Sequence, residues 1–310
     1  MLRFVFASVG CALTWAVSTV IFARVLRGAP GGSPAALNLV KCVLAFPPLV
    51  ALGLAQGDGW PTTAGHGGAL FVSAALGLAV SDTGYFVALS RLGVARGVLF
   101  IPLVPVVTAA LAAVFLGDPL GATEGAGMAL VLGGLVLVLV RGQTDDVAGT
   151  DAHDVAPAAV KGAARARLVG VLAGLGSALA QGVSNTLMKK AVVAGAASHV
   201  AALRIGFGSV ALAVVVALSG GPHTVLPFLR RGVFGPVFVA SCLGTFLGMW
   251  LGTYGAKGLP IGIATTLAAT TPVWALVLAR FTGERVTLRA AAGAVVAVAG
   301  VVVLALSTLR

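Results

Sequence analysis

The chain has 310 residues, of which 59% are hydrophobic and only 9% charged, and its mean hydropathy is +1.07. A soluble globular domain carries about 25% charged residues, so this composition argues against a water-soluble protein. The formal net charge of +11 would suggest nucleic-acid binding in a soluble chain. No zinc-finger spacing, RNA-binding motif or basic–aromatic stripe accompanies it, so we expect no nucleic-acid partner.

Long apolar runs follow one another along the chain. A helix needs about 20 apolar residues to cross the hydrocarbon core, and backbone polar groups in lipid must be satisfied within the segment. The strict alternation of a transmembrane barrel does not occur in these runs. The sequence therefore predicts an all-α integral membrane protein with ten transmembrane helices, at 3–24, 34–55, 68–90, 94–116, 122–140, 167–189, 197–219, 233–256, 260–281 and 287–308.

One segment differs in composition. Residues 142–166 are mostly small, polar or charged and show no apolar period, which predicts a flexible linker. It separates a first five-helix repeat (1–141) from a second (167–310). The repeats share glycine and acid positions 166 residues apart: Gly117-Asp118 with Gly283-Glu284, Gly127 with Gly293, and Gly134 with Gly300.

Five spans is an odd number, so the second repeat must enter the membrane from the opposite side to the first. Duplication with an odd span count predicts two inverted five-helix repeats, an architecture typical of transporters. The fifth-span glycines, and Gly244, Gly248 and Gly252 in the eighth span, predict close helix packing.

Basic residues bear on orientation. With a cytoplasmic N-terminus, five basic residues would lie on the cytoplasmic side and thirteen on the other. Because basic residues in short loops stay in the cytoplasm, the count favours a plasma-membrane protein with both termini outside and the linker cytoplasmic.

The segments LVPVVTAALAAVFLGD and TTPVWALVLARFTGE, each followed by a glycine-rich span, resemble EamA-type members of the drug/metabolite transporter superfamily. That family has proline in the fourth span, then Gly-Glu, and a basic residue in the second span of each repeat. Lys41 and Arg204 match the last feature, and Asp118 replaces the usual glutamate. The resemblance covers nearly the whole chain except the linker. It implies small-molecule export or import by alternating access, although many relatives are thought to keep their termini in the cytoplasm.

Three charged residues lie well inside predicted spans, at least seven residues from either end. Asp82 lies well inside the third span, where a charge costs about 2.5–3.5 kcal/mol on insertion scales. Lys41 lies at a similar depth in the antiparallel second span, so the two can pair. Asp82 is then either a structural partner, a loop-side residue of a misplaced span, or a carboxylate that carries protons or binds a cation. Lys41 and Arg204 either bind an anionic substrate group or extend to the membrane interface, and inversion places them toward opposite faces.

Uncharged polar residues suggest a central cavity. Gln181, Ser184, Asn185 and Met188 lie on one helical face. We expect Gln181 and Asn185 to line the cavity together with the residues Trp15, Tyr85 and Thr270. The alternative is that such side chains only form interhelical hydrogen bonds, as they commonly do in membranes.

Little else in the sequence carries chemistry. The three cysteines lie in separate apolar runs, and no closely spaced Cys or His set predicts a metal site. No phosphate-binding GxxxxGK[ST] motif occurs, so we expect neither a cofactor nor ATP hydrolysis. The leading hypothesis is a secondary transporter driven by protons, another ion or substrate exchange. A membrane-embedded enzyme and a non-transporting subunit are the alternatives, and a homodimer is possible.

Overall fold

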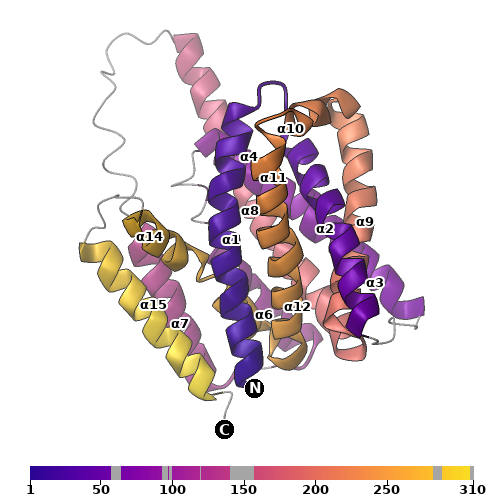
Figure 1. The fold of residues 1–310 in the computed structure, drawn as a ribbon. Coiled ribbons are helices and arrows are strands. Elements are labelled where there is room, and N and C mark those ends of the chain that lie inside the picture. The colour runs from indigo at the N-terminus through magenta and orange to yellow at the C-terminus, as the bar shows by residue number, and fades with distance from the viewer. Residues whose placement is uncertain are drawn as a thin grey trace.

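The computed structural model describes residues 1–56, 64–92, 97, 100–118, 120–139, 157–281 and 288–307. Within these ranges the regular structure is helical, without strands. Figure 1 shows the helices as one bundle in which both termini lie at the same end. This placement agrees with an even number of membrane crossings.

The first half contains α1 (Leu2–Gly28), α2 (Pro34–Gln56), α3 (Ala64–Ala74), the π-helix η1 (Ala75–Asp82), α4 (Thr83–Leu92), α6 (Leu103–Phe115) and α7 (Ala122–Leu139). The second half contains α8 (Pro157–Ala194), α9 (Ala197–Ser219), the short η4 (Pro222–Val225) and α10 (Leu226–Leu229), α11 (Phe234–Ala240), the π-helix η5 (Ser241–Leu247), α12 (Gly248–Gly258), α13 (Ile261–Ala268), α14 (Thr271–Phe281) and α15 (Leu288–Ser307).

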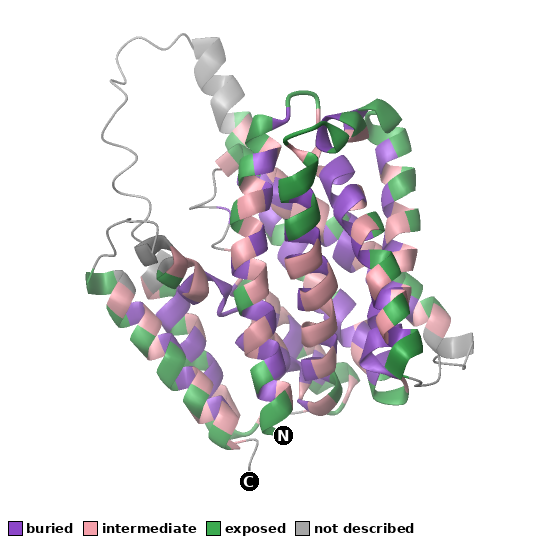
Figure 2. Cartoon of the chain, in the orientation of Figure 1, coloured by how far each residue is buried: buried purple, intermediate pink, exposed green. Residues whose placement is uncertain are grey.

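Six of these helical segments are long and apolar enough to cross a bilayer, and they coincide with six of the predicted spans. Four shorter apolar helices, of 10–17 residues, lie within the other four predicted spans, so the total of ten remains a prediction. The outward helix faces carry exposed large hydrophobic side chains such as Phe6, Val114 and Leu218 (Figure 2). A surface of this kind suits lipid rather than water, which confirms a multi-pass membrane protein.

The two halves interlock instead of packing as separate units. Helix α1 lies against α11, η5 and α12 of the second half, and α8 lies against α3, η1 and α4 of the first. Helix α2 packs on α9, and α7 lies beside α15 at one edge of the bundle (Figure 1). Each first helix thus contacts the third helical segment of the other repeat, so the protein interior is built between the repeats.

Glycines make the close contacts that their spacing predicts. On α7, Gly134 faces the backbone of Gly293 and Ala297, and on α15 Gly300 faces the backbone of Gly127 and Val131. A methyl group at Gly134 or Gly300 would collide with the opposite helix. The α7–α15 seam therefore depends on the absence of side chains at these two positions.

The glycines of η5 and α12 form a second seam. Gly244 faces Ser18 of α1, Gly248 faces Trp15, and Gly252 faces Cys11. Small residues on one helix thus admit larger side chains of the other, which confirms the close packing predicted from their four-residue spacing.

The third segment of each half contains a π-helix, at 75–82 and 241–247, and the starts are 166 residues apart. A π-helix accommodates an extra residue, which turns the following residues by roughly 100° relative to a regular α-helix and leaves carbonyl groups without their usual partner. Side chains of other helices satisfy two of these carbonyls. Asn38 Nδ2 donates to Leu78 O at 2.5 Å, and Trp15 Nε1 donates to Gly244 O at 2.9 Å.

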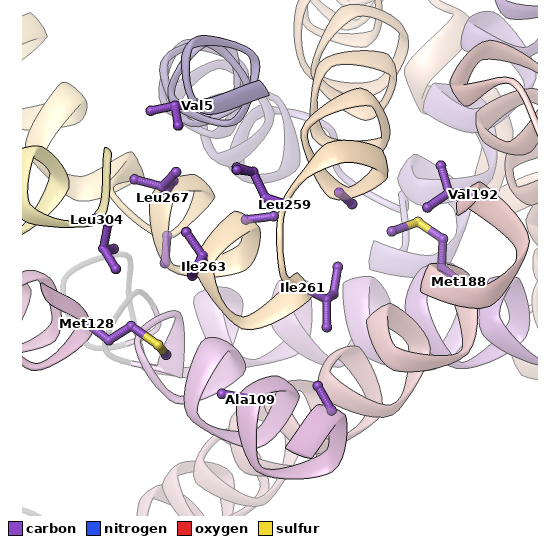
Figure 3. Packing of buried hydrophobic residues seen from close by; sticks show 14 of the residues in the cluster. Val5, Ala109, Met128, Met188, Val192, Leu259, Ile261, Ile263, Leu267 and Leu304 are labelled. Carbon is purple, nitrogen blue, oxygen red and sulfur yellow. The ribbon is translucent and has the colours of Figure 1, made fainter. Parts of the chain in front are cut away.

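A large apolar cluster occupies the end of the bundle near the termini (Figure 3). Ile261 and Ile263 of α13 lie at its centre, with Val5 of α1 and Ala109 of α6 around them. A second cluster, which includes Phe22, Phe86 and Phe228, forms toward the opposite end. The space between the clusters is where the polar side chains gather.

Two boundaries differ from the sequence-based expectation. Helix α8 begins at Pro157, within the predicted linker, because proline is accommodated in the first turn and the alanine-rich segment after it favours helix. The predicted ninth span is interrupted at Ala269 and Thr270, between α13 and α14. Glu284, the counterpart of Asp118, lies outside the described residues.

Asp118 itself accepts a hydrogen bond from the backbone N–H of Ile261, at 3.3 Å. Ile261 is the first residue of α13, so the carboxylate sits at a helix N-terminus, where a negative charge is favourable. Asp118 therefore sits at the start of a helix that belongs to the other half.

Candidate functional site

A cavity of about 210 Å³ lies at the interface of the two repeats. Its wall is formed by residues of both π-helices and of α1, α2, α4, α6, α8, α9, α12 and α13. Seven of the eight residues predicted from the sequence line it: Trp15, Lys41, Asp82, Tyr85, Gln181, Asn185 and Arg204. The structure therefore brings together residues from five separate segments of the chain, although it does not test their roles.

Lys41 and Asp82 form the predicted ion pair. Lys41 Nζ donates to Asp82 Oδ2 at 2.6 Å, and Nζ also lies 5.2 Å from the centre of the Phe86 ring. The Lys41 side chain is 10% exposed and that of Asp82 is 29% exposed. Asp82 is the last residue of η1, so the π-helix sets the direction in which its carboxylate faces α2. The pair joins α2 to the third segment of the same repeat.

Arg204 has a different environment. Its residue is 3% exposed, Nη2 donates to Ser184 Oγ at 2.9 Å, and Nη1 lies 2.8 Å from Met188 Sδ and 3.8 Å from Met249 Sδ. Nε has no hydrogen-bond partner among the described residues. The Arg204 guanidinium thus lines the cavity, and the groups that it contacts are all neutral. Two of them are thioethers, which are weak hydrogen-bond acceptors.

Lys41 and Arg204 occupy equivalent places in the two repeats. Each is the eighth residue of a 23-residue helix, α2 or α9, and these helices run in opposite directions (Figure 1). At 1.5 Å per residue the backbone of each residue lies roughly 10 Å from the start of its helix. The placement of the two cations toward opposite faces stays a prediction.

The polar face of α8 points into the same cavity. Gln181 Nε2 donates to Asn185 Oδ1 at 2.9 Å, one helical turn apart. Ser184 Oγ donates to the Ser73 carbonyl at 2.7 Å, so a lone pair of the same oxygen is available to accept from Arg204. Gln181 and Asn185 thereby offer amide groups to a ligand, while Ser184 ties the arginine to α3.

Tyr85 and Thr270 differ in what they offer. The Tyr85 hydroxyl is buried and has no hydrogen-bond partner in the described part of the chain. Thr270 does not line the cavity, and its hydroxyl donates to Leu267 O at 2.7 Å. The break between α13 and α14 directs Thr270 away, whereas Thr265 and Thr271 line the wall. Both of their hydroxyls donate to carbonyls of the preceding turn.

Several wall residues were not predicted. Met249 and Thr253 of α12 and Phe100 contribute to the cavity, and Asn38 stabilises η1 behind it. Met249 directly follows Gly248 in the sequence, and Gly248 was predicted only to allow close helix packing. No sequence signal marks either π-helix, because its extra residue becomes visible only when the neighbouring helices fix the register.

No group of three or more potential metal ligands occurs in the described residues, and all three cysteines are free thiols. The charged and amide side chains of the cavity offer ionic and hydrogen-bonding recognition inside a largely apolar wall.

An interlocked inverted repeat with a charged cavity at its centre defines the class of membrane transporters. The family comparison gives the particular group: the model of the EamA-like transporter family matches residues 2–140 and 168–306, one match for each repeat. The chain belongs to this family, so it is a membrane transporter of that type. The two matches leave out the whole of the predicted linker.

One solved structure, described only as the crystal structure of a protein, is similar in fold. It superposes with a TM-score of 0.72 over 99% of this chain and 96% of its own, at 18% sequence identity. At this identity the similarity concerns the fold alone. No curated protein matches the chain.

Proposed function

We propose that this protein is a secondary active transporter that moves a small metabolite or drug-like molecule by alternating access, with Asp82 as the coupling carboxylate. The observation that carries the proposal is the Lys41–Asp82 pair, 2.6 Å long, in the wall of a cavity shared by two inverted repeats. The pair is the single ion pair among the described residues, and both of its members line the cavity.

The pair provides a simple coupling step. While Lys41 contacts Asp82, the two charges compensate each other inside the cavity. In the proposed cycle a movement of α2 relative to η1 separates the two, and a proton replaces Lys41 as the partner of the carboxylate. Opening of the pair therefore takes up a proton from the side to which the cavity is open, and re-formation of the pair releases it.

Orientation is part of the proposal. By sequence, most of the basic residues fall in segments on the side of the predicted spans opposite the termini, including Arg91, Arg230 and Arg231. We therefore place the termini outside the cell and the linker in the cytoplasm of a plasma-membrane protein.

The test uses purified protein in liposomes that contain a pH-sensitive dye, with a library of small metabolites added outside. The wild type should move protons in response to at least one compound. The double variant Asp82→Asn, Lys41→Gln should lose this response and remain folded. Asp82→Asn alone leaves a buried lysine unpaired, at a cost of up to about 3–5 kcal/mol, so the double variant is the cleaner probe.

Glu124→Gln is the matched control, because Glu124 lies in the first turn of α7 and does not line the cavity. An unchanged proton response in the double variant would remove Asp82 from the mechanism. A wild type that moves no protons with any compound would refute proton coupling, and one that also accumulates none of the compounds inside the liposomes would favour a non-transporting membrane subunit.

A further inference from the structure

Arg204 is a buried cation that no carboxylate contacts among the described residues. The residue is 3% exposed, its partners are the hydroxyl of Ser184 and the thioethers of Met188 and Met249, and Nε has no partner there. Removing a guanidinium from water costs several kcal/mol unless an anion compensates it. The cavity wall beside it is where such an anion can approach.

The charges of the cavity support the same conclusion. Its described wall contains two cations, Lys41 and Arg204, and one carboxylate, Asp82. Because Lys41 and Asp82 neutralise each other at 2.6 Å, one positive charge remains, and it belongs to Arg204. A ligand with a single negative charge would make the cavity neutral, whereas a dianion would leave it negative.

We propose that Arg204 is an anion-binding residue and that the substrate is an amphipathic monocarboxylate. Its carboxylate accepts hydrogen bonds from the guanidinium in place of the weak thioether contacts, and its apolar part lies along wall residues such as Leu78, Ile101 and Val104. A phosphate monoester carries a charge of about −1.5 to −2 at neutral pH, so it fits the single excess charge less well.

The surroundings hold the guanidinium ready for this ligand. Ser184 Oγ donates to Ser73 O and accepts from Nη2, which fixes one edge of the side chain against α3. Gly77 of η1 leaves room for Nη2, since a methyl group there would lie 2.9 Å from that nitrogen. Met188 and Met249 are flexible and polarisable, so they can move aside when an anion arrives.

The first test measures binding, so its outcome is independent of transport, although the term substrate rests on the proposed function. Purified wild-type protein in nanodiscs is titrated with hexanoate, hexanamide, hexylamine and hexanedioate, and thermal unfolding and tryptophan fluorescence are recorded. Hexanoate should bind at least about tenfold more tightly than the other three, because a charge-assisted hydrogen bond contributes about 1.5–3 kcal/mol and 1.4 kcal/mol is tenfold. Equal binding of hexanoate and hexanamide, no binding of hexanoate, or equal stabilisation by chloride alone would overturn the proposal.

Variants at Arg204 and Met249 test the residue. Arg204→Gln should lose the preference for hexanoate, and Arg204→Lys should retain part of it. Met249→Glu keeps the arginine and supplies an internal anion, since the Met249 sulfur lies 3.8 Å from Nη1. This variant should unfold at a higher temperature than the wild type without ligand and bind hexanoate at least about tenfold more weakly.

Met249→Gln is the matched control, because it has a similar size and no charge, and it should still prefer hexanoate to hexanamide. The comparison of the Met249→Glu and Met249→Gln variants keeps the test valid even where Arg204→Gln does not fold. Equal hexanoate affinity in the Met249→Glu and Met249→Gln variants would reduce Arg204 to a structural role.

Discussion

Replacing Gly134 with alanine should weaken the protein, although alanine is the better helix former. The new methyl carbon would lie 2.8 Å from Ala297 Cα and still closer to the Ala297 nitrogen, whereas ordinary contacts begin at 3.4 Å. These atoms are backbone and cannot rotate away. Helices α7 and α15 would have to separate by roughly 0.6–1 Å, and gaps of this size forfeit a quarter to a half of the dispersion energy of each contact.

We expect Gly134→Ala to lower the free energy of unfolding by about 1–3 kcal/mol, as overpacking commonly does. Gly133→Ala is the control on the same helix, because a methyl group there meets nothing within 4 Å. Alanine at position 133 should be neutral or stabilise by up to about 1 kcal/mol. Unfolding in mixed detergent–SDS micelles measures both variants. Equal stability of the two would refute the packing argument.

Two further predictions concern other elements. Trp15→Phe should lower the free energy of unfolding by about 1–3 kcal/mol, because it leaves the buried Gly244 carbonyl of η5 without its hydrogen-bond donor. Trp250→Phe is the comparison, since it removes no such bond within the described residues. An equal loss in both variants would contradict the role of Trp15. A reporter that works only outside the cell should be active when fused after Arg310, because the count of basic residues along the sequence predicts termini outside. A signal restricted to a cytoplasmic reporter would reverse the orientation.

Much of the architecture follows from local properties of the chain. Hydrophobic length predicts the positions of the helices, because any run that crosses lipid must satisfy its own backbone. The 166-residue offset predicts the repeats, and the depth of Lys41 and Asp82 in antiparallel spans predicts their contact. Glycine spacing likewise predicts the α7–α15 seam, since close approach requires small residues on both helices.

Other features depend on contacts that no local pattern reveals. The π-helices require Asn38 and Trp15 to satisfy carbonyls in segments 40 and 229 residues away. The thioether environment of Arg204 requires Met188 and Met249 from two different helices. Thr270 was predicted to line the cavity, but the interruption before α14 turns its hydroxyl to the Leu267 carbonyl. In each case the tertiary arrangement, and not residue type, determines which way the group faces.

The matching π-helices also bear on the ancestry of the chain. An extra residue gained after the two halves had begun to diverge would distort one half only, yet both carry the irregularity at corresponding positions, 75 and 241. The simplest account is inheritance from a single five-helix ancestor that already had the distortion. The pocket-forming irregularity is then older than the fused gene, and the two descendants have since placed different residues there, an aspartate at 82 and a glycine at 248.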